Sequence, residues 1–323
     1  MIIVTGAAGF IGSNIIRGLN QIGITNILAV DDLTDGRKYR NLAVVNFSDY
    51  MDFKDFLHYI EHNKKFSDQK IEAIFHEGAC SDTTEWNGAY MMKNNYEFSK
   101  IVLHYCLDYQ IQFIYASSAA IYGANTDFND QDLHQLPLNV YGYSKWKFDQ
   151  YVQPYLNLKN LASQIVGLRY FNVYGPHENH KNKMASVAFH LMNQLRDSNT
   201  VKLFSGCDAY GDGEQERDFI YIDDVVNMNL WFLKHPKKSG IFNCGTGKAR
   251  SFNAIAKKLI QLNNSGKLEY IPFPDNLKGA YQSFTQANLT ALRSAGFHDE
   301  FSSLESGLEK YFNWFQGAGQ FPR

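Results

Sequence analysis

The sequence has few of the features that mark secreted, membrane-spanning or nucleic-acid-binding proteins. Its 323 residues include four cysteines, at 80, 106, 207 and 244, without any Cys-x2-Cys spacing, so we expect reduced thiols in a cytoplasmic protein. No apolar stretch reaches the roughly 18–20 residues that a bilayer span needs. A net charge of -2 and the lack of a basic run argue against a nucleic-acid partner. Because the first residues already have the pattern of a sheet strand, we expect no signal peptide.

The chain does have a glycine-rich turn at its N-terminus. An apolar run over 1–4 leads into Gly6-x2-Gly9-x2-Gly12, and apolar residues at 11, 15, 16 and 19 indicate a helix. Gly6 permits a tight turn, Gly9 lets a pyrophosphate approach the backbone, and Gly12 allows close packing of helix on strand. In this strand–turn–helix context the motif predicts a dinucleotide bound at the helix N-terminus, although its spacing differs by one residue from the commonest fingerprint.

The second strand, over 26–30, bears on which dinucleotide is bound. It ends in Asp31 and Asp32, where an acidic residue meets the adenosine ribose, and a carboxylate there favours the free 2′-hydroxyl of NAD. Arg37 and Lys38 follow closely, and they are able to neutralise the 2′-phosphate of NADP. The charges alone leave the choice open.

A serine, a tyrosine and a lysine have the spacing of an acid–base site. Ser118 ends an apolar strand, and Tyr141 and Lys145 stand four residues apart at the start of a predicted helix, on one helical face. An ammonium beside a phenol stabilises the phenolate, so we expect Lys145 to lower the pKa of Tyr141 toward that of a general base. The Ser118 hydroxyl is then expected to bind the substrate oxygen that loses its proton.

Apolar runs at 73–76, 113–116 and 164–169 alternate with amphipathic stretches at 49–62, 94–109 and 144–157. This alternation predicts the α/β class, with a doubly wound parallel sheet (Rossmann) and a smaller α/β substrate lobe interleaved in sequence. The dinucleotide-binding domain is assigned to 1–170, completed by about 217–245 and about 282–295, and the substrate lobe to 171–216, 246–281 and 296–323. Segments 220–224 and 240–243 are expected to return to the main sheet, with helices at 184–197 and 302–315 and a strand at 201–204.

A metal site is not predicted. His58, Glu61 and His62 match a His-x2-Glu-His pattern of one metallopeptidase group. The helical pattern over 53–62 places them mainly on the polar face, in a crossover away from the strand ends where ligands bind, so we interpret them as a solvated surface.

The glycine turn, Ser118 and the Tyr141-x3-Lys145 pair together resemble the extended short-chain dehydrogenase/reductase family, which acts on nucleotide sugars. Segments 172–176, 217–221 and 243–247 resemble it too, so that the match covers nearly the whole chain. Dehydratases of this family carry an Asp-Glu pair after the serine, where this chain has Ala119 and Ala120. Reductase-epimerases of the fucose pathway use a Cys–His pair, and this strand end has no cysteine. The resemblance therefore implies epimerisation through transient oxidation, or simple dehydrogenation.

Segments 76–86, 184–190, 270–274 and 281–286 carry a more specific resemblance, to the epimerases of this family that act on ADP-heptose. It implies inversion at C6″ of ADP-D-glycero-β-D-manno-heptose for the lipopolysaccharide inner core, with tightly held NADP, in a closed homo-oligomer that is expected to be a pentamer. Two departures stand out: the loop 207–216 is longer than usual, and Phe53 replaces a cofactor-contacting lysine. The adjacent Lys54 is expected to point elsewhere on its helix.

The same resemblance assigns the site residues. Tyr141, poised by Lys145 and opposite Ser118, takes the C6″ hydroxyl proton in one substrate orientation, and Lys181 serves as acid/base for the other. The NADP set is Gly6, Gly9, Phe10, Ile11, Gly12, Asp31, Asp32, Lys38 (for the 2′-phosphate), Glu77, Gly78, Ala79, Cys80, Ser81, Asn94, Lys145, Val173 and Lys181. The substrate set is Asn172, Lys183, His190, Phe204, Ser205, Gly206, Cys207, Arg217 and Tyr281. Arg217 also has an independent argument, because a guanidinium fork suits a diphosphate.

Two other functions remain open. A UDP-hexose 4-epimerase shares the Ser–Tyr–Lys set, and substrate assays would distinguish it from an epimerase that acts on ADP-heptose. A non-catalytic NADP-sensing module is possible on grounds of fold, although such a protein has no need of the complete set.

Overall fold

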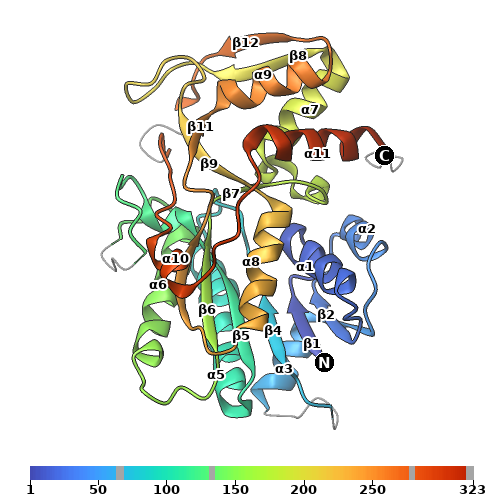
Figure 1. The fold of residues 1–323 in the computed structure, drawn as a ribbon, viewed down its shortest axis with the longest axis vertical. Helices are drawn as coiled ribbons and strands as arrows, with labels where there is room; N and C mark the ends of the chain where they lie inside the picture. Colours follow the sequence, from blue (N-terminus) through green and yellow to red (C-terminus); the bar gives the residue numbers. More distant parts are fainter. Residues whose placement is uncertain (63–68, 131–134, 276–280, 318–323) are drawn as a thin grey trace.

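The computed structural model describes residues 1–62, 69–130, 135–275 and 281–317 (Figure 1). Its centre is a seven-stranded parallel sheet in the order β10-β6-β5-β4-β1-β2-β3. The strands are β1 (Ile2–Thr5), β2 (Ile27–Asp31), β3 (Asp49–Asp52), β4 (Ala73–His76), β5 (Gln112–Ser118), β6 (Ile165–Tyr170) and β10 (Gly240–Cys244). The predicted doubly wound parallel sheet is confirmed, and the expected return of 240–243 to it is correct.

Helices cover both faces of this sheet, because its strands are apolar on both sides. Val4 and Phe75 pack toward α1 (Phe10–Gln21) and α8 (Ile222–Lys234), which lie side by side in Figure 1. The neighbouring residues Ile3 and Ile74 pack on the opposite face with α3 (Phe53–Glu61), α5 (Phe98–Tyr109) and α6 (Val140–Leu156). Because the seven strands are parallel, their carboxyl ends lie together at one edge of the sheet.

A smaller part lies above that edge in Figure 1. It contains a three-stranded sheet in the order β11-β9-β7 and the pair β12-β8. Its elements are β7 (Asn172–Tyr174), α7 (Val187–Ser198), β8 (Thr200–Phe204), β9 (Glu216–Tyr221), β11 (Ala249–Ser251), α9 (Phe252–Leu262), β12 (Lys267–Ile271) and α11 (Leu304–Gly317). The elements come from separate stretches of the sequence; the bounds assigned to the two domains stay a prediction.

Short elements connect these parts. They are η1 (Gly36–Lys38), α2 (Tyr39–Leu42), α4 (Gly88–Met91), the π-helical turn η2 (Met92–Glu97), η3 (Ala119–Tyr122), η4 (Asn179–Met184) and α10 (Thr290–Ala295). None of the helices within the described ranges is long and apolar enough to cross a membrane.

One expectation about secondary structure is wrong. Residues 220–224 do not return to the main sheet: β9 ends at Tyr221 between β7 and β11, and α8 begins at Ile222. A short apolar run fits a buried strand of either sheet, so its pattern does not select one. The helical pattern over 53–62 corresponds to α3, whose start is capped by the Asp52 side chain, which accepts a hydrogen bond from the Lys54 N–H at 2.9 Å.

Candidate active site

The glycine turn has the geometry that a dinucleotide needs. Gly6 has φ +67°, and a Cβ on it would lie 2.7 Å from the Gly78 nitrogen. A Cβ on Gly12 would lie 2.2 Å from the Gly6 carbonyl oxygen. Gly9 precedes α1 without any side-chain cap, so the first N–H groups of the helix are left for a ligand. A pyrophosphate fits this uncapped helix start, both by close backbone approach and by charge.

Asp31, at the end of β2, is already fully engaged. One carboxylate oxygen accepts from the Ala8 N–H at 2.7 Å, and the other from the Asp32 N–H at 2.7 Å and from the Lys38 ammonium. Arg37 pairs instead with Asp35, at 2.7 Å on the surface. Asp31 therefore braces the glycine turn and holds Lys38 beside the predicted ribose position.

Asp32 follows Asp31 and lies among cations. The pKa of Asp32 is lowered first by hydrogen bonds from Thr34, then by the charges of Lys38 and Lys54. The direction of the Lys54 side chain stays a prediction. Phe53 packs against Phe98, with 6.1 Å between the ring centroids.

Glu77 follows β4 and lies in a buried polar group with Tyr170 and Asn229. Its Oε1 accepts a hydrogen bond from the Tyr170 hydroxyl at 3.0 Å, and Asn229 Nδ2 donates to the same hydroxyl at 3.0 Å. Its Oε2 is buried without a partner in the described part of the chain. Burial raises the pKa of Glu77 to about 7, against the opposing effects of Tyr170 and Lys145. Tyr170 and Asn229 were not predicted, because their hydrogen-bond partners lie on other elements.

Residues 78–81 follow Glu77 along the chain. Asn95, which was not predicted, holds Cys80 in place. Asn95 accepts from the Cys80 N–H at 2.8 Å and donates to the Cys80 carbonyl at 3.0 Å and to Ser144 Oγ at 3.0 Å. The predicted residue Asn94 donates at 2.8 Å to the Tyr90 carbonyl of its own helix. Both asparagines lie on the π-helical turn η2. A π-turn has more residues than an α-helical turn, so the direction of each side chain could not be predicted from α-helical periodicity.

Ser118, Tyr141 and Lys145 gather where β5 ends and α6 begins. Asn139 caps α6 by accepting from the Gly142 N–H at 2.8 Å, and a Cβ on Gly142 would lie 2.7 Å from the Ala120 carbonyl. This close approach brings Tyr141 to Ser118. Burial raises the pKa of Tyr141, and its hydrogen bond with Ser118 acts against that rise.

Lys145 does not produce the lowered phenol pKa that the sequence led us to expect. Its side chain is 5% exposed, and its ammonium donates to the Ala116 carbonyl at 2.8 Å, since a buried ammonium needs an acceptor. Burial lowers the pKa of Lys145 to about 8, while Glu77 and Asp149 oppose the shift. Asp149 accepts from Arg169 Nε at 2.8 Å in a fully buried ion pair that ties α6 to β6. Neither member of this pair was predicted.

Lys181 lies on η4, on the side of the glycine turn. Its half-buried ammonium is 5.3 Å from the Phe10 ring centroid, at the first residue of α1. Burial lowers the pKa of Lys181, and Glu178 opposes that shift. Lys183, two residues on, donates to Thr84 Oγ1 at 2.6 Å and pairs with Asp82 at 3.4 Å, which joins this loop to the segment 82–84.

Arg217 is the centre of the predicted substrate side. Its side chain is 6% exposed, and its guanidinium carbon lies 4.7 Å from the Tyr281 ring centroid and 5.7 Å from that of Phe252. The neighbouring Asp218 is occupied by the N–H groups of Thr246, Gly247 and Ala287, at 2.8, 2.8 and 3.0 Å. Arg217 is therefore a desolvated cation between aromatic rings, with its own N–H donating to the Glu216 carbonyl at 2.9 Å. Such a cation suits an anionic ligand.

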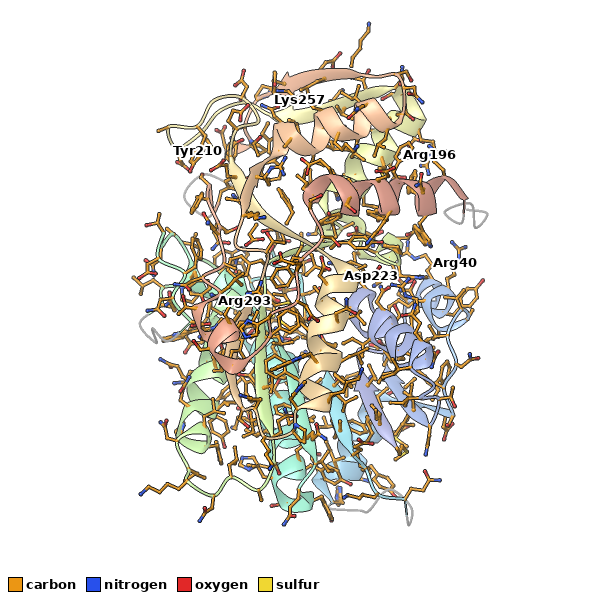
Figure 2. The ribbon with its side chains drawn as sticks, in the orientation of Figure 1. Arg40, Arg196, Tyr210, Asp223, Lys257 and Arg293 are labelled. Atoms are coloured by element: carbon orange, nitrogen blue, oxygen red, sulfur yellow. The ribbon has the colours of Figure 1, made fainter. Side chains whose placement is uncertain are left out.

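The long loop before Arg217 folds back on itself. The Gly206 N–H donates to Asp212 at 2.8 Å, and the Gly213 N–H to the Phe204 carbonyl at 3.1 Å. Figure 2 labels Tyr210 at its outer rim. Burial has the largest effect on the pKa values of Arg217 and Tyr281, and Cys207 is near enough to both to act toward a higher pKa of each. These three predicted residues therefore lie in one group.

The remaining predicted substrate residues lie around this group. Asn172 Oδ1 accepts from Thr285 Oγ1 at 3.5 Å, and His190 lies on α7 with its ring centroid 6.0 Å from that of Phe189. Val173, assigned to the cofactor, is half-buried on β7. On α3, His58, Glu61 and His62 are exposed, and the described residues contain no group of three or more metal-ligating side chains.

A parallel sheet with a glycine turn at its switch edge, and a serine, tyrosine and lysine beside it, defines a dinucleotide-dependent enzyme of the short-chain dehydrogenase type. A family model described as NAD dependent epimerase/dehydratase matches residues 2–245, and the chain belongs to that family. It is 54% identical over 313 residues to an ADP-L-glycero-D-manno-heptose-6-epimerase of Alkalilimnicola ehrlichii, covering 97% of each chain.

Two solved structures are also similar. The ADP-L-glycero-D-manno-heptose-6-epimerase of Helicobacter pylori has a TM-score of 0.84 and 31% identity, covering 98% of this chain and 96% of that one. The UDP-glucose 4-epimerase of Thermotoga maritima, solved with UDP-glucose, has a TM-score of 0.80 and 28% identity, covering 99% of each chain. The family resemblance stated from the sequence is therefore confirmed.

Proposed function

We propose that this protein interconverts ADP-D-glycero-β-D-manno-heptose and ADP-L-glycero-β-D-manno-heptose by transient oxidation at C6″, for the lipopolysaccharide inner core. The observation that carries the proposal is the 54% identity, over 97% of each chain, to a protein with that named activity. The buried Arg217 between Tyr281 and Phe252 supports a diphosphate-linked substrate.

NADP is the proposed cofactor, and when bound its nicotinamide accepts the C6″ hydride and returns it. Lys38, held by Asp31 at the end of β2, supports a 2′-phosphate partner at this position. The uncapped start of α1 would hold the pyrophosphate, and Glu77 and Cys80 would line the cleft. Acid-released cofactor identified as NAD alone would overturn this part of the proposal.

The chain's own residues divide the proton work. In one substrate orientation Tyr141 takes the C6″ hydroxyl proton, and Ser118, whose hydrogen bond opposes the rise that burial causes in the pKa of Tyr141, binds the same oxygen. In the other orientation the sugar presents its opposite face, and Lys181 holds or releases the proton. The lowered pKa of Lys181 supports this role, because a base works best when its pKa is near the working pH.

The direct test is incubation with ADP-D-glycero-β-D-manno-heptose followed by resolution of the two C6″ epimers. We expect interconversion without solvent deuterium at C6″ in heavy water. No interconversion, together with turnover of a UDP-hexose, would favour the 4-epimerase instead. Dinucleotide binding without turnover of either substrate would favour the sensing module. Action in the cytoplasm and assembly as a closed homo-oligomer, expected to be a pentamer, stay predictions.

The assignment of two bases has its own test. Tyr141→Phe should lower turnover by about 10²–10⁴-fold, because a positioned proton acceptor contributes that much. Tyr143→Phe, an exposed tyrosine two residues along the same helix, is the matched control and should keep full activity. Tyr141→Phe and Lys181→Ala should impair oxidation of the two epimers unequally; equal losses would show that the division is wrong.

A further inference from the structure

The loop that carries Lys181 has a buried carboxylate at its base, Glu178. The residue is 0% exposed. Its Oε1 accepts from the Ser186 hydroxyl at 2.6 Å, from the Tyr311 hydroxyl at 2.9 Å and from the Gly175 N–H at 3.4 Å, while Oε2 accepts from the Ser186 N–H at 2.5 Å. The Glu178 side chain thus joins Gly175 before the loop, Ser186 after it and Tyr311 on α11.

These hydrogen bonds describe an ionised group. The two N–H groups donate by necessity, and Ser186 Oγ accepts from the Phe189 N–H at 3.2 Å as the cap of α7, which leaves its own hydrogen for Glu178. A carboxylate that receives this many donors has no need of a proton, although burial raises the pKa of Glu178. Glu178 therefore brings a negative charge into the loop that carries Lys181.

The loop backbone needs such an anchor. His177 has φ +77° and Asn182 has φ +48°, so that two non-glycine residues in the left-handed region flank the segment from Glu178 to Lys181. A backbone of this kind persists only when its surroundings hold it. A helical bond from the Lys181 N–H to the Glu178 carbonyl, at 3.0 Å, adds to the anchor.

We propose that Glu178 is a positioning residue for Lys181: its buried carboxylate ties the loop that carries Lys181 to Gly175, Ser186 and Tyr311, and it brings a negative charge into that loop. The proposal rests on the acid/base role proposed for Lys181. Without this charge the half-buried ammonium loses part of its compensation, so the pKa of Lys181 falls further below its usual range.

The other charged groups around the loop do not replace Glu178. They include Arg17 from α1, Asp35, Arg37 and Lys38 from the η1 segment, Arg40 from α2, His177 and His180 on the loop, and Tyr311 from α11. Burial lowers the pKa of His177 and of His180 to about 4, so both rings are neutral at pH 7. Asp35 is half-buried and paired with Arg37.

The test measures Lys181 itself. Reductive methylation with ¹³C-formaldehyde labels lysine amines, and the Lys181 resonance is the one that Lys181→Arg removes. In Glu178→Gln, which keeps the size but not the charge, we expect the titration of this resonance to fall by about one pH unit, because the negative charge of Glu178 favours the charged form of Lys181. Tyr311→Phe, which removes one donor but keeps the carboxylate, is the matched control and should move it far less.

Activity gives the second readout. The acid limb of the epimerisation profile should move to lower pH in Glu178→Gln, with a lower kcat, for the epimer that Lys181 serves. Should Glu178→Gln fail to fold, Glu178→Asp keeps the charge on a shorter stem and should preserve the Lys181 titration while lowering kcat. An unshifted Lys181 resonance in Glu178→Gln, or an equal shift in Tyr311→Phe, overturns the proposal. Since the resonance needs no substrate, a failed epimerase assay leaves this result separate.

Discussion

At the scale of the residue, the burial of Arg217 makes its guanidinium a stronger binding site for an anion than a surface arginine would be. A surface arginine is satisfied by water or by a neighbouring carboxylate, but here the guanidinium is buried between Tyr281 and Phe252. Burial lowers the pKa of Arg217, which means that its charge is poorly solvated, and an anion at this position gains correspondingly more.

Arg217→Lys should therefore weaken ADP binding by about tenfold or more, since a lysine ammonium can neither stack on the two rings nor bind a diphosphate bidentately. KM for the nucleotide sugar should rise by a similar factor with kcat little changed. Calorimetry with ADP measures the first effect. Arg196→Lys on the exposed surface of α7, labelled in Figure 2, is the control. ADP affinity that is unchanged in Arg217→Lys would remove this residue from the diphosphate site.

At the scale of the element, the start of α1 depends on backbone contact. Gly12→Ala would force a Cβ against the Gly6 carbonyl, 2.2 Å away, and neither backbone atom is free to move without opening the turn. We expect a loss of about 1–3 kcal/mol of stability from overpacking, with loss of bound dinucleotide. Urea unfolding and the absorbance of released cofactor measure the two effects. Gly36→Ala, with open space around its Cβ position, should change neither; retention of cofactor by Gly12→Ala would contradict the predicted role of the turn.

Elements that are defined by local spacing were predictable from the sequence. The glycine turn, the serine at the end of β5 and the Tyr–Lys pair on α6 each depend on neighbours within a few positions. Asn95, Tyr170 and Glu178 were not found, because their hydrogen-bond partners lie on other elements and their own segments have ordinary patterns.

At the scale of the whole molecule, the structure brings together ionisable groups whose burial gives opposite responses to acid. Glu77 has its pKa raised to about 7, so the folded protein binds a proton there before the unfolded chain does, and acidification from pH 7 toward 4.5 favours folding through this group. His76, His177 and His180 have pKa values lowered by burial to about 3, 4 and 4. For these the unfolded chain binds protons first, so acidification below pH 6.5 favours unfolding.

The histidine contribution can be isolated at His76, which is 2% exposed and lies 2.8 Å from Thr5 Oγ1 and 3.0 Å from Ser99 Oγ. From pH 6.5 to 5 its neutral ring should cost the folded state about 2 kcal/mol relative to the unfolded chain. His76→Gln, whatever its stability at pH 7, should therefore lose about 2 kcal/mol less than the native protein on going to pH 5, as measured by urea unfolding at both pH values. His298→Gln, an exposed histidine, should keep the native dependence. An equal loss in His76→Gln and the native protein would mean that the buried ring does not control acid stability.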